Sequence, residues 1–122
     1  MNARLVARYG GAGPGVHNPD PLYFALGAIQ AEVYGVPFHP TLEEKAAAVA
    51  YAIMREHVFL DGNKRTGTEV LLQFLELNGA TVAASDDEFV ATADACANGT
   101  LTRDQYCGWV RTHRVPPPRS EV

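Results

Sequence analysis

The stretch HVFLDGNKRTG, His57–Gly67, joins two amphipathic segments of the chain through a short loop that is rich in polar residues. Before it, apolar residues recur at helical spacing across Thr41–Glu56, behind a Thr41–Glu44 capping box. After it, a second apolar stripe runs through Lys64–Asn78, and Asn78-Gly79 is typical of a helix end. The sequence therefore predicts two consecutive helices that meet in a tight joint.

Three other segments carry helix signals. Asp20-Pro21 supplies an N-cap and a first-turn proline, and apolar residues then recur at helical spacing as far as Val33, with a stop at Gly35. Capping boxes at Ser85–Glu88 and Thr102–Gln105 predict two further helices. No stretch alternates cleanly enough to predict a strand. We expect an all-α fold, a compact bundle of about five to six helices with a Gly-rich N-terminal loop.

The composition predicts one domain that spans residues 1–122, with an N-terminal segment and loop over residues 1–19 and a flexible tail over residues 115–122. The formal net charge of -4 argues against non-specific nucleic-acid binding, which needs a basic surface. We see no signal peptide and no apolar run of the roughly 20 residues that a membrane span requires. Two cysteines form no disulfide framework. We therefore expect a cytoplasmic protein without a membrane or a direct nucleic-acid partner.

The start of the second helix has the features of an anion-binding site. Backbone N–H groups in the first turn of a helix have no partner within the helix, and the helix dipole adds partial positive charge there. Gly62 permits close approach of the backbone, and Asn63 can cap the helix or donate its amide to a phosphate. Lys64 and Arg65 add full charges. These residues together favour a phosphate ligand.

The same loop carries groups for proton transfer and for metal binding. His57 can accept a proton from a hydroxyl that attacks phosphorus, and Asp61 offers an oxygen ligand for Mg²⁺. Phe59 is expected to anchor the loop in the core. Taken singly, Asp61 or Asn63 could be only a cap, and His57 only a cation at a helix end. Their combination in one loop favours phosphoryl or nucleotidyl transfer.

HVFLDGNKRTG resembles the Fic/Doc signature, H-x-F-x-[D/E]-G-N-x-R. With Lys64 and Thr66, and with LLQFLELNG following at Leu71–Gly79, it looks like the Doc (death-on-curing) branch. YGGAGPGVHNPD at Tyr9–Asp20 resembles the flap loop of that branch. The resemblance implies a Fic-like fold and the toxin of a type II toxin–antitoxin system. It also implies a kinase that uses ATP and Mg²⁺ to phosphorylate a threonine of elongation factor Tu, inhibits translation, and is neutralised by a small cognate antitoxin.

The resemblance also implies a role for each matching residue. His57 would be the catalytic base and Asp61 the Mg²⁺ ligand, and Asn63 would complete the catalytic loop. The implied phosphate-binding residues are Arg55, Gly62, Asn63, Lys64, Arg65 and Thr66. The flap residues implied to dock the target are Tyr9, Gly10, Gly11, Gly13 and Gly15.

Two positions bear on the choice of reaction. Fic enzymes that transfer AMP have glycine at the position of Lys64 and a second arginine at the position of Thr68, so the resemblance favours a kinase here. A Fic-type protein adenylyltransferase and a non-catalytic relative that only binds a partner are the alternatives. The internal inhibitory pattern of some Fic proteins, [ST]-x-x-x-E-[GN], does not occur in the sequence. Inhibition would then come from a separate protein.

Overall fold

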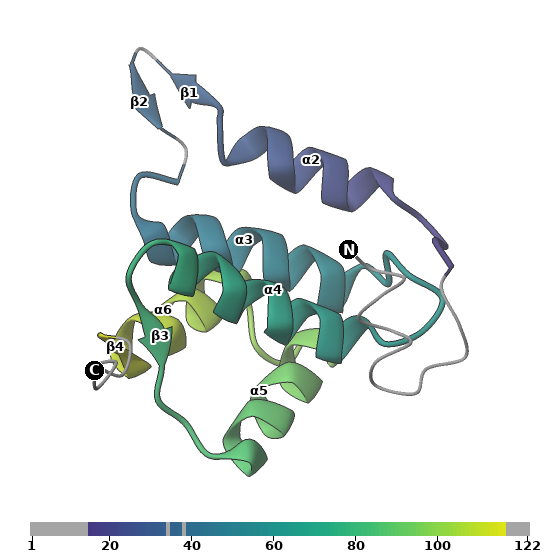
Figure 1. Cartoon of the computed structure of the whole chain (residues 1–122). Coiled ribbons are helices and arrows are strands. Elements are labelled where there is room, and N and C mark those ends of the chain that lie inside the picture. Colours follow the sequence, from purple (N-terminus) through teal and green to yellow (C-terminus); the bar gives the residue numbers. More distant parts are fainter. Residues whose placement is uncertain (1–14, 34, 38, 117–122) are drawn as a thin grey trace.

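The computed structural model of this chain describes residues 15–33, 35–37 and 39–116 (Figure 1). Within these ranges the chain is mostly helical, so the all-α prediction is confirmed. The helices are α2 (Asp20–Ala28), α3 (Leu42–Arg55), α4 (Asn63–Leu77), α5 (Asp86–Asn98) and α6 (Arg103–His113). The strands are β1 (Glu32–Val33), β2 (Val36–Pro37), β3 (Thr81–Val82) and β4 (Arg114–Val115).

Helix α3 is the centre of the molecule. It contacts α2, α4, α5 and α6, and in Figure 1 it runs beside α4 in the middle of the bundle, with α2 on one side and α6 and α5 on the other. Small residues make this packing possible: Ala46, Ala47 and Ala50 are fully buried. Because alanine holds neighbouring backbones close together, α3 can bury almost its whole surface against the other four helices.

The apolar side chains form two buried clusters. The larger one joins α3, α4, α5 and α6 and includes Met54, Leu71 and Cys96. The smaller one lies beneath the loop between α3 and α4, where Val58 and Phe59 pack with residues of α2, α3 and α4. Phe59 is thus in the core, as the sequence predicted. The loop that carries the histidine is therefore held by hydrophobic burial on its inner side.

The predicted helix starts are largely confirmed. Ser85 and Thr102 form complete capping boxes with Glu88 and Gln105. At α3, Thr41 Oγ1 accepts a hydrogen bond of 3.1 Å from the backbone N–H of Glu44. Each cap satisfies N–H groups that would otherwise lack partners in the first turn.

The first predicted helix is shorter than expected. Helix α2 ends at Ala28, and Val33 lies in β1, which pairs antiparallel with β2. Gly35, which we expected to stop a helix, has φ +80° and takes part in this hairpin turn instead. Asp20 is not the N-cap but the first helical residue, because Pro19 occupies the cap position. Because β1 and β2 pair in a hairpin, the expectation that the chain has no strands was wrong.

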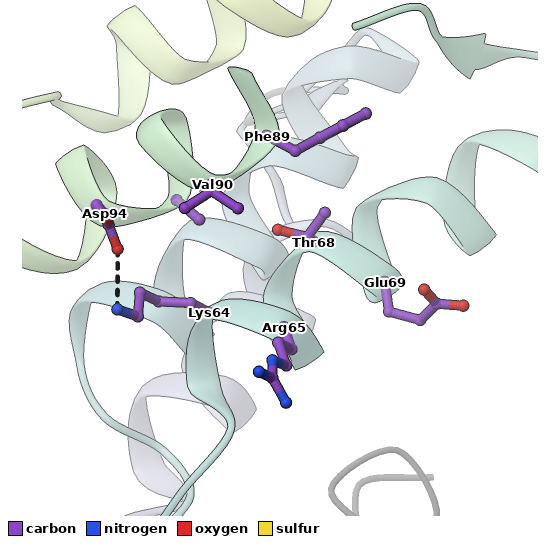
Figure 2. A pocket seen from close by; sticks show the side chains of 8 residues that line it. Lys64, Arg65, Thr68, Glu69, Phe89, Val90 and Asp94 are labelled. Atoms are coloured by element: carbon purple, nitrogen blue, oxygen red, sulfur yellow. Dashed lines mark hydrogen bonds and ion pairs between the residues drawn. The ribbon is translucent and has the colours of Figure 1, made fainter. Parts of the chain in front are cut away.

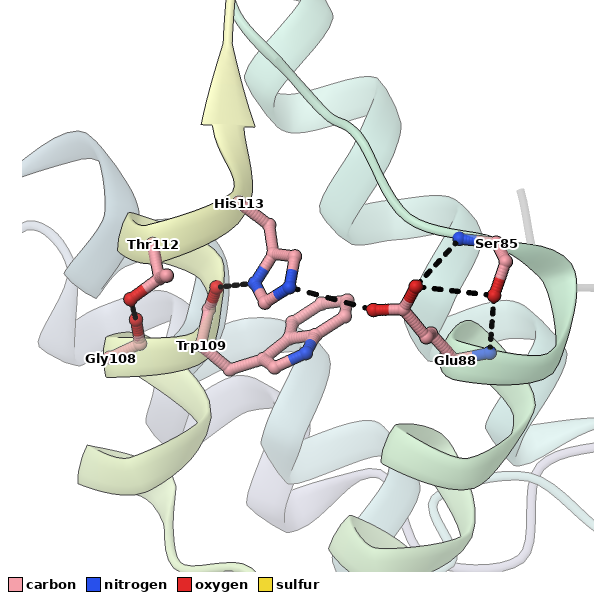
Figure 3. A network of polar contacts seen from close by, with 6 residues as sticks. All are labelled: Ser85, Glu88, Gly108, Trp109, Thr112 and His113. Carbon is pink, nitrogen blue, oxygen red and sulfur yellow. Dashed lines mark hydrogen bonds and ion pairs between the residues drawn. The ribbon is translucent and has the colours of Figure 1, made fainter.

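The C-terminal part of the described chain is held in place by two sets of contacts. Val115, which we expected in a flexible tail, pairs with Thr81 in a second small sheet. The ring of His113 stacks on Trp109 at 4.7 Å, and its Nε2 lies 3.5 Å from Glu88 Oε2 (Figure 3). Glu88 belongs to the Ser85 capping box, so this network joins α6 to the start of α5. No helix in the described ranges is long and apolar enough to cross a membrane.

Candidate active site in the loop between α3 and α4

The loop between α3 and α4 presents His57 to solvent on a constrained backbone. Helix α3 ends at Arg55, and His57 has φ +50°, a left-handed conformation that side chains other than glycine seldom adopt. Val58 and Phe59, the next two residues, are buried, whereas His57 is exposed. The burial of its neighbours keeps His57 in this conformation and leaves its imidazole at the surface.

Asn63 holds the loop from the opposite side. Its Oδ1 accepts a hydrogen bond of 2.9 Å from the backbone N–H of Phe59, and its Nδ2 donates one of 2.8 Å to the carbonyl of the same residue. The N-cap of α4 is Gly62, at φ +74°, so Asn63 does not cap the helix, which was one of the roles that its sequence position allowed. The side-chain amide instead satisfies both polar backbone groups of a residue whose side chain is buried.

The N-terminus of α4 differs from those of the other described helices. It has no side-chain cap and no acid in its first turn, which contains Lys64 and Arg65. Helices α3, α5 and α6 each begin with a capping side chain and at least one acid, and α2 has an acid. The helix dipole at the start of α4 is therefore not neutralised by acids of its own first turn.

Of the predicted phosphate ligands, Lys64 and Arg55 make contacts with α5. Lys64 Nζ lies 2.8 Å from Asp94 Oδ1, an ion pair in which both side chains are about half exposed. Arg55 Nη1 donates a hydrogen bond of 3.5 Å to the carbonyl of Ala97, and its guanidinium lies against Gly99. Arg55 thus stands at the C-terminal end of α5, where a cation interacts well with the helix dipole.

Thr66 and Arg65 occupy opposite environments in the first turns of α4. Thr66 is buried, and its Oγ1 has no hydrogen-bond partner among the described residues. Arg65 is exposed. A buried threonine is better placed for packing than for contact with an external phosphate. Its backbone N–H is also occupied, because it donates a hydrogen bond of 2.8 Å to the carbonyl of Gly62.

Asp61 is exposed, and its Oδ1 accepts a hydrogen bond of 2.7 Å from the N–H of Gly62. Nowhere in the described ranges do three or more acidic, histidine or cysteine side chains gather as metal ligands. Mg²⁺ bound with a nucleotide needs only one or two carboxylates, because phosphate oxygens and water complete its coordination. A single exposed carboxylate beside the start of α4 fits that mode of binding.

Residues 15–18 brace the loop from a third direction. Val58 accepts hydrogen bonds from the N–H groups of His17 at 2.9 Å and Asn18 at 3.0 Å, and the N–H of Leu60 donates to Gly15 at 3.1 Å. A Cβ on Gly15 would meet Leu60 Cδ1 at 2.5 Å. Among the predicted flap residues, Gly15 therefore lies directly against the loop. The others, Tyr9, Gly10, Gly11 and Gly13, lie outside the described residues.

A cavity of about 400 Å³ lies between α4 and α5, beside Lys64 and Arg65 (Figure 2). The residues of α5 that line it, Phe89, Val90, Ala93 and Asp94, were not predicted as part of any site. No motif connects them with α4, because they come into contact with it only through the packing of the two helices against each other.

Residues 1–75 match the model of the Fic/DOC family, so this chain belongs to that family. Two proteins that are similar in sequence to this chain carry the name Doc. The chain is 42% identical over 80 residues to "Toxin Doc" of Mycolicibacterium smegmatis, an alignment that covers 66% of this chain and 60% of the relative. It is 37% identical over 82 residues to "Protein kinase doc" of Escherichia phage P1, covering 67% and 64%. The chain thus matches less than two thirds of the length of either relative, and α5 and α6 lie beyond the family match.

Proposed function

We propose that this protein is a Doc-type toxin of a toxin–antitoxin pair. Its reaction is the transfer of the γ-phosphate of ATP to a hydroxyl group, a threonine of a translation factor such as elongation factor Tu, which inhibits translation. The printed names of the two relatives, a Doc toxin and a Doc protein kinase, support this class of function. The resemblance of HVFLDGNKRTG to the family signature supports the roles of individual residues.

One observation carries the proposal: an exposed histidine lies in the loop that leads into a cationic helix start, which has neither a side-chain cap nor a first-turn acid. The first-turn N–H groups of α4, with Lys64 and Arg65, match the negative charge of a polyphosphate. His57 is close in sequence and is held on a fixed backbone. An imidazole in that place can take the proton of an attacking hydroxyl as the oxygen forms its bond to phosphorus.

The other residues of the loop hold its backbone and the Asp61 carboxylate in position. Asn63 fixes Phe59 through two hydrogen bonds, and Phe59 in turn is buried, so the backbone on either side of Asp61 has little freedom. We propose that Asp61 holds Mg²⁺ together with the nucleotide. When bound, the ion neutralises charge on the phosphate oxygens.

Phosphate transfer is favoured over AMP transfer by Lys64 and Thr68. Thr68 carries no charge and cannot make the two parallel hydrogen bonds with which arginine holds a phosphate. Lys64 carries a full charge where the AMP-transferring relatives have glycine. We further propose that a separate antitoxin protein controls the activity, since the sequence lacks the internal inhibitory pattern.

The test is to incubate the protein with elongation factor Tu and either γ-labelled or α-labelled ATP. Label on the factor from γ-labelled ATP alone is the expected result. Label on the factor from α-labelled ATP would show that the protein transfers AMP and not the γ-phosphate. Binding of ATP without any label transfer would indicate a partner-binding relative that has no catalytic activity.

The same assay tests His57. We expect His57→Ala to abolish transfer and to leave ATP binding and the circular-dichroism spectrum close to those of the parent protein. His17→Ala is the matched control, because His17 is also exposed and also lies at the loop, yet contacts it through its backbone N–H. If His57→Ala transfers label at the parent rate, His57 is not the base.

A further inference from the structure

Helix α2 is apolar on all sides, yet it is covered mainly on the side that faces α3 (Figure 1). After Asp20 it carries no charged residue, and Ala25 is its only buried residue. Tyr23 and Phe24 are 68% and 80% exposed, and Leu26 is 41% exposed. A helix that is apolar all round is normally buried all round. The outer face of α2 therefore indicates a protein partner.

A groove of about 470 Å³ lies along this face, between α2 and α3. Small side chains supply much of its lining, namely Ala25, Ala28, Ala48 and Ala52. Because alanine fills little space, the groove has room for a bulky side chain from outside. Phe24, which is largely exposed, also lines it. The same face thus carries both an exposed aromatic ring and a hollow that can receive one.

The two ends of the groove carry opposite charges. Asp20 and Glu56 line it where α2 begins and α3 ends. Arg103 lies nearer the start of α3, because it also lines a smaller cavity together with Glu44 and Ala47. Neither Glu56 nor Arg103 forms an ion pair with another described residue. Both charges are therefore available to a partner.

We infer that the α2 face is an interface between two copies of this chain, related by a two-fold axis. In such a dimer the same patch of both copies is in contact, so the patch has to complement itself. Phe24 of each copy enters the groove of the other, and Glu56 of each copy pairs with Arg103 of the other. A ring beside a hollow, and an acid opposite a base, fit a second copy better than a partner of one charge. The inference goes beyond the proposed function and does not depend on it.

Phe24 offers the first test, by sedimentation velocity over a roughly hundredfold range of protein concentration. We expect the parent protein to change from monomer to dimer as the concentration rises. Phe24→Gln should weaken dimerisation by roughly tenfold or more, because an exposed aromatic anchor is lost. Leu77→Gln is the matched control, since Leu77 is 86% exposed at the end of α4 and does not line the groove. Glutamine suits a helix at both positions, and Leu77→Gln should dimerise like the parent.

The second test exchanges the charges. Glu56→Arg and Arg103→Glu each place like charges opposite each other in a two-fold dimer, so each variant alone should be mostly monomeric where the parent is dimeric. An equimolar mixture should regain the dimer, because one copy then carries two arginines and the other two glutamates at these positions. Both changes suit the local helix dipoles, at the C-cap of α3 and in the first turn of α6. Circular dichroism of each variant checks the fold.

A parent protein that stays monomeric at every concentration would overturn the inference, and this is the result expected if another part of the chain or a different protein covers α2. A dimer that withstands Phe24→Gln and both charge changes would also overturn it, since the interface would then lie elsewhere. So would a mixture that forms no more dimer than its components, because the two ends of the groove would then not pair. None of these measurements uses ATP or elongation factor Tu, so their outcome is separate from that of the labelling assay.

Discussion

At the scale of single residues, His57 combines exposure with backbone strain. Its φ of +50° costs about 1–2 kcal/mol for a residue that carries a Cβ. The two buried residues that follow it, and the Asn63 side chain that holds Phe59, keep the backbone in place against this cost. Strain of this kind persists only where the surroundings fix the backbone, and it is often found at functional sites.

A glycine at this position would release the strain. We expect His57→Gly to be more stable to urea unfolding than His57→Ala by up to about 1 kcal/mol, since glycine adopts positive φ without a Cβ penalty. The gain is limited because glycine also has more freedom in the unfolded chain. If His57→Gly proves less stable than His57→Ala, the left-handed conformation at residue 57 is not strained.

The sequence was informative about the character of these residues but less so about their partners. The burial of Phe59 followed from its chemistry, and the exposed His57 from its place in a polar loop. The bonds of Asn63 to Phe59 did not follow, because capping, phosphate binding and bracing all use the same amide. Only the folded path of the loop places the backbone of Phe59 within reach of that side chain.

At the scale of elements, Gly67 determines how closely α3 and α4 pack. A Cβ at this position would lie 2.4 Å from Met54 Cγ and 3.0 Å from the backbone carbonyl of Ala50. Met54 could move, but the Ala50 carbonyl belongs to the backbone of α3. The close packing of the two helices that flank the His57 loop thus depends on the absence of one side chain.

We expect Gly67→Ala to lower the free energy of unfolding by about 1–3 kcal/mol, because the added methyl group forces α3 and α4 apart. Gly108→Ala in α6 is the matched control. A Cβ there meets no atom within 4 Å, so the higher helix propensity of alanine should stabilise the protein by roughly 0.5–1 kcal/mol. Opposite signs for the two variants in urea unfolding would confirm the close contact, and a stabilising Gly67→Ala would contradict it.

The helices themselves were largely predictable, since capping residues and apolar spacing are local signals. Helices α3 and α4 begin and end within a residue of the predicted positions, and α5 and α6 begin directly after their predicted caps. The hairpin after α2 was missed, because a glycine after an apolar run serves equally well as a helix stop or as a turn with positive φ. Pairing with Val36, rather than anything within the segment, places Val33 in a strand.

At the scale of the whole molecule, the core depends on thiols that stay protonated. Burial raises the pKa of the Cys96 thiol from 9.0 to about 12. Burial likewise raises the pKa values of Cys107 and of the Tyr106 phenol. Both cysteines are free and buried, in agreement with the prediction that they form no disulfide framework. The large core cluster to which all three belong brings together α5 and α6, which lie beyond the family match.

The raised pKa of Cys96 makes stability sensitive to alkaline pH. The folded state retains a proton that the unfolded chain loses, so this contribution is complete below pH 9.0 and is lost as pH rises toward about 12. Each such group adds up to about 1.4 kcal/mol of lost stability per pH unit within its window. Urea unfolding across this range should show a steeper decline in the parent than in Cys96→Ala. Equal slopes would mean that Cys96 titrates normally in the folded protein.

The carbonyl of Val58 accepts two N–H groups from His17 and Asn18, and Val58 is the immediate neighbour of His57. These two hydrogen bonds join the segment that leads into α2 to the backbone beside the imidazole. A molecule that displaced residues 15–18 would break these two hydrogen bonds and remove one support of the backbone beside His57. The segment that leads into α2 is therefore part of the scaffold that holds the histidine loop in shape.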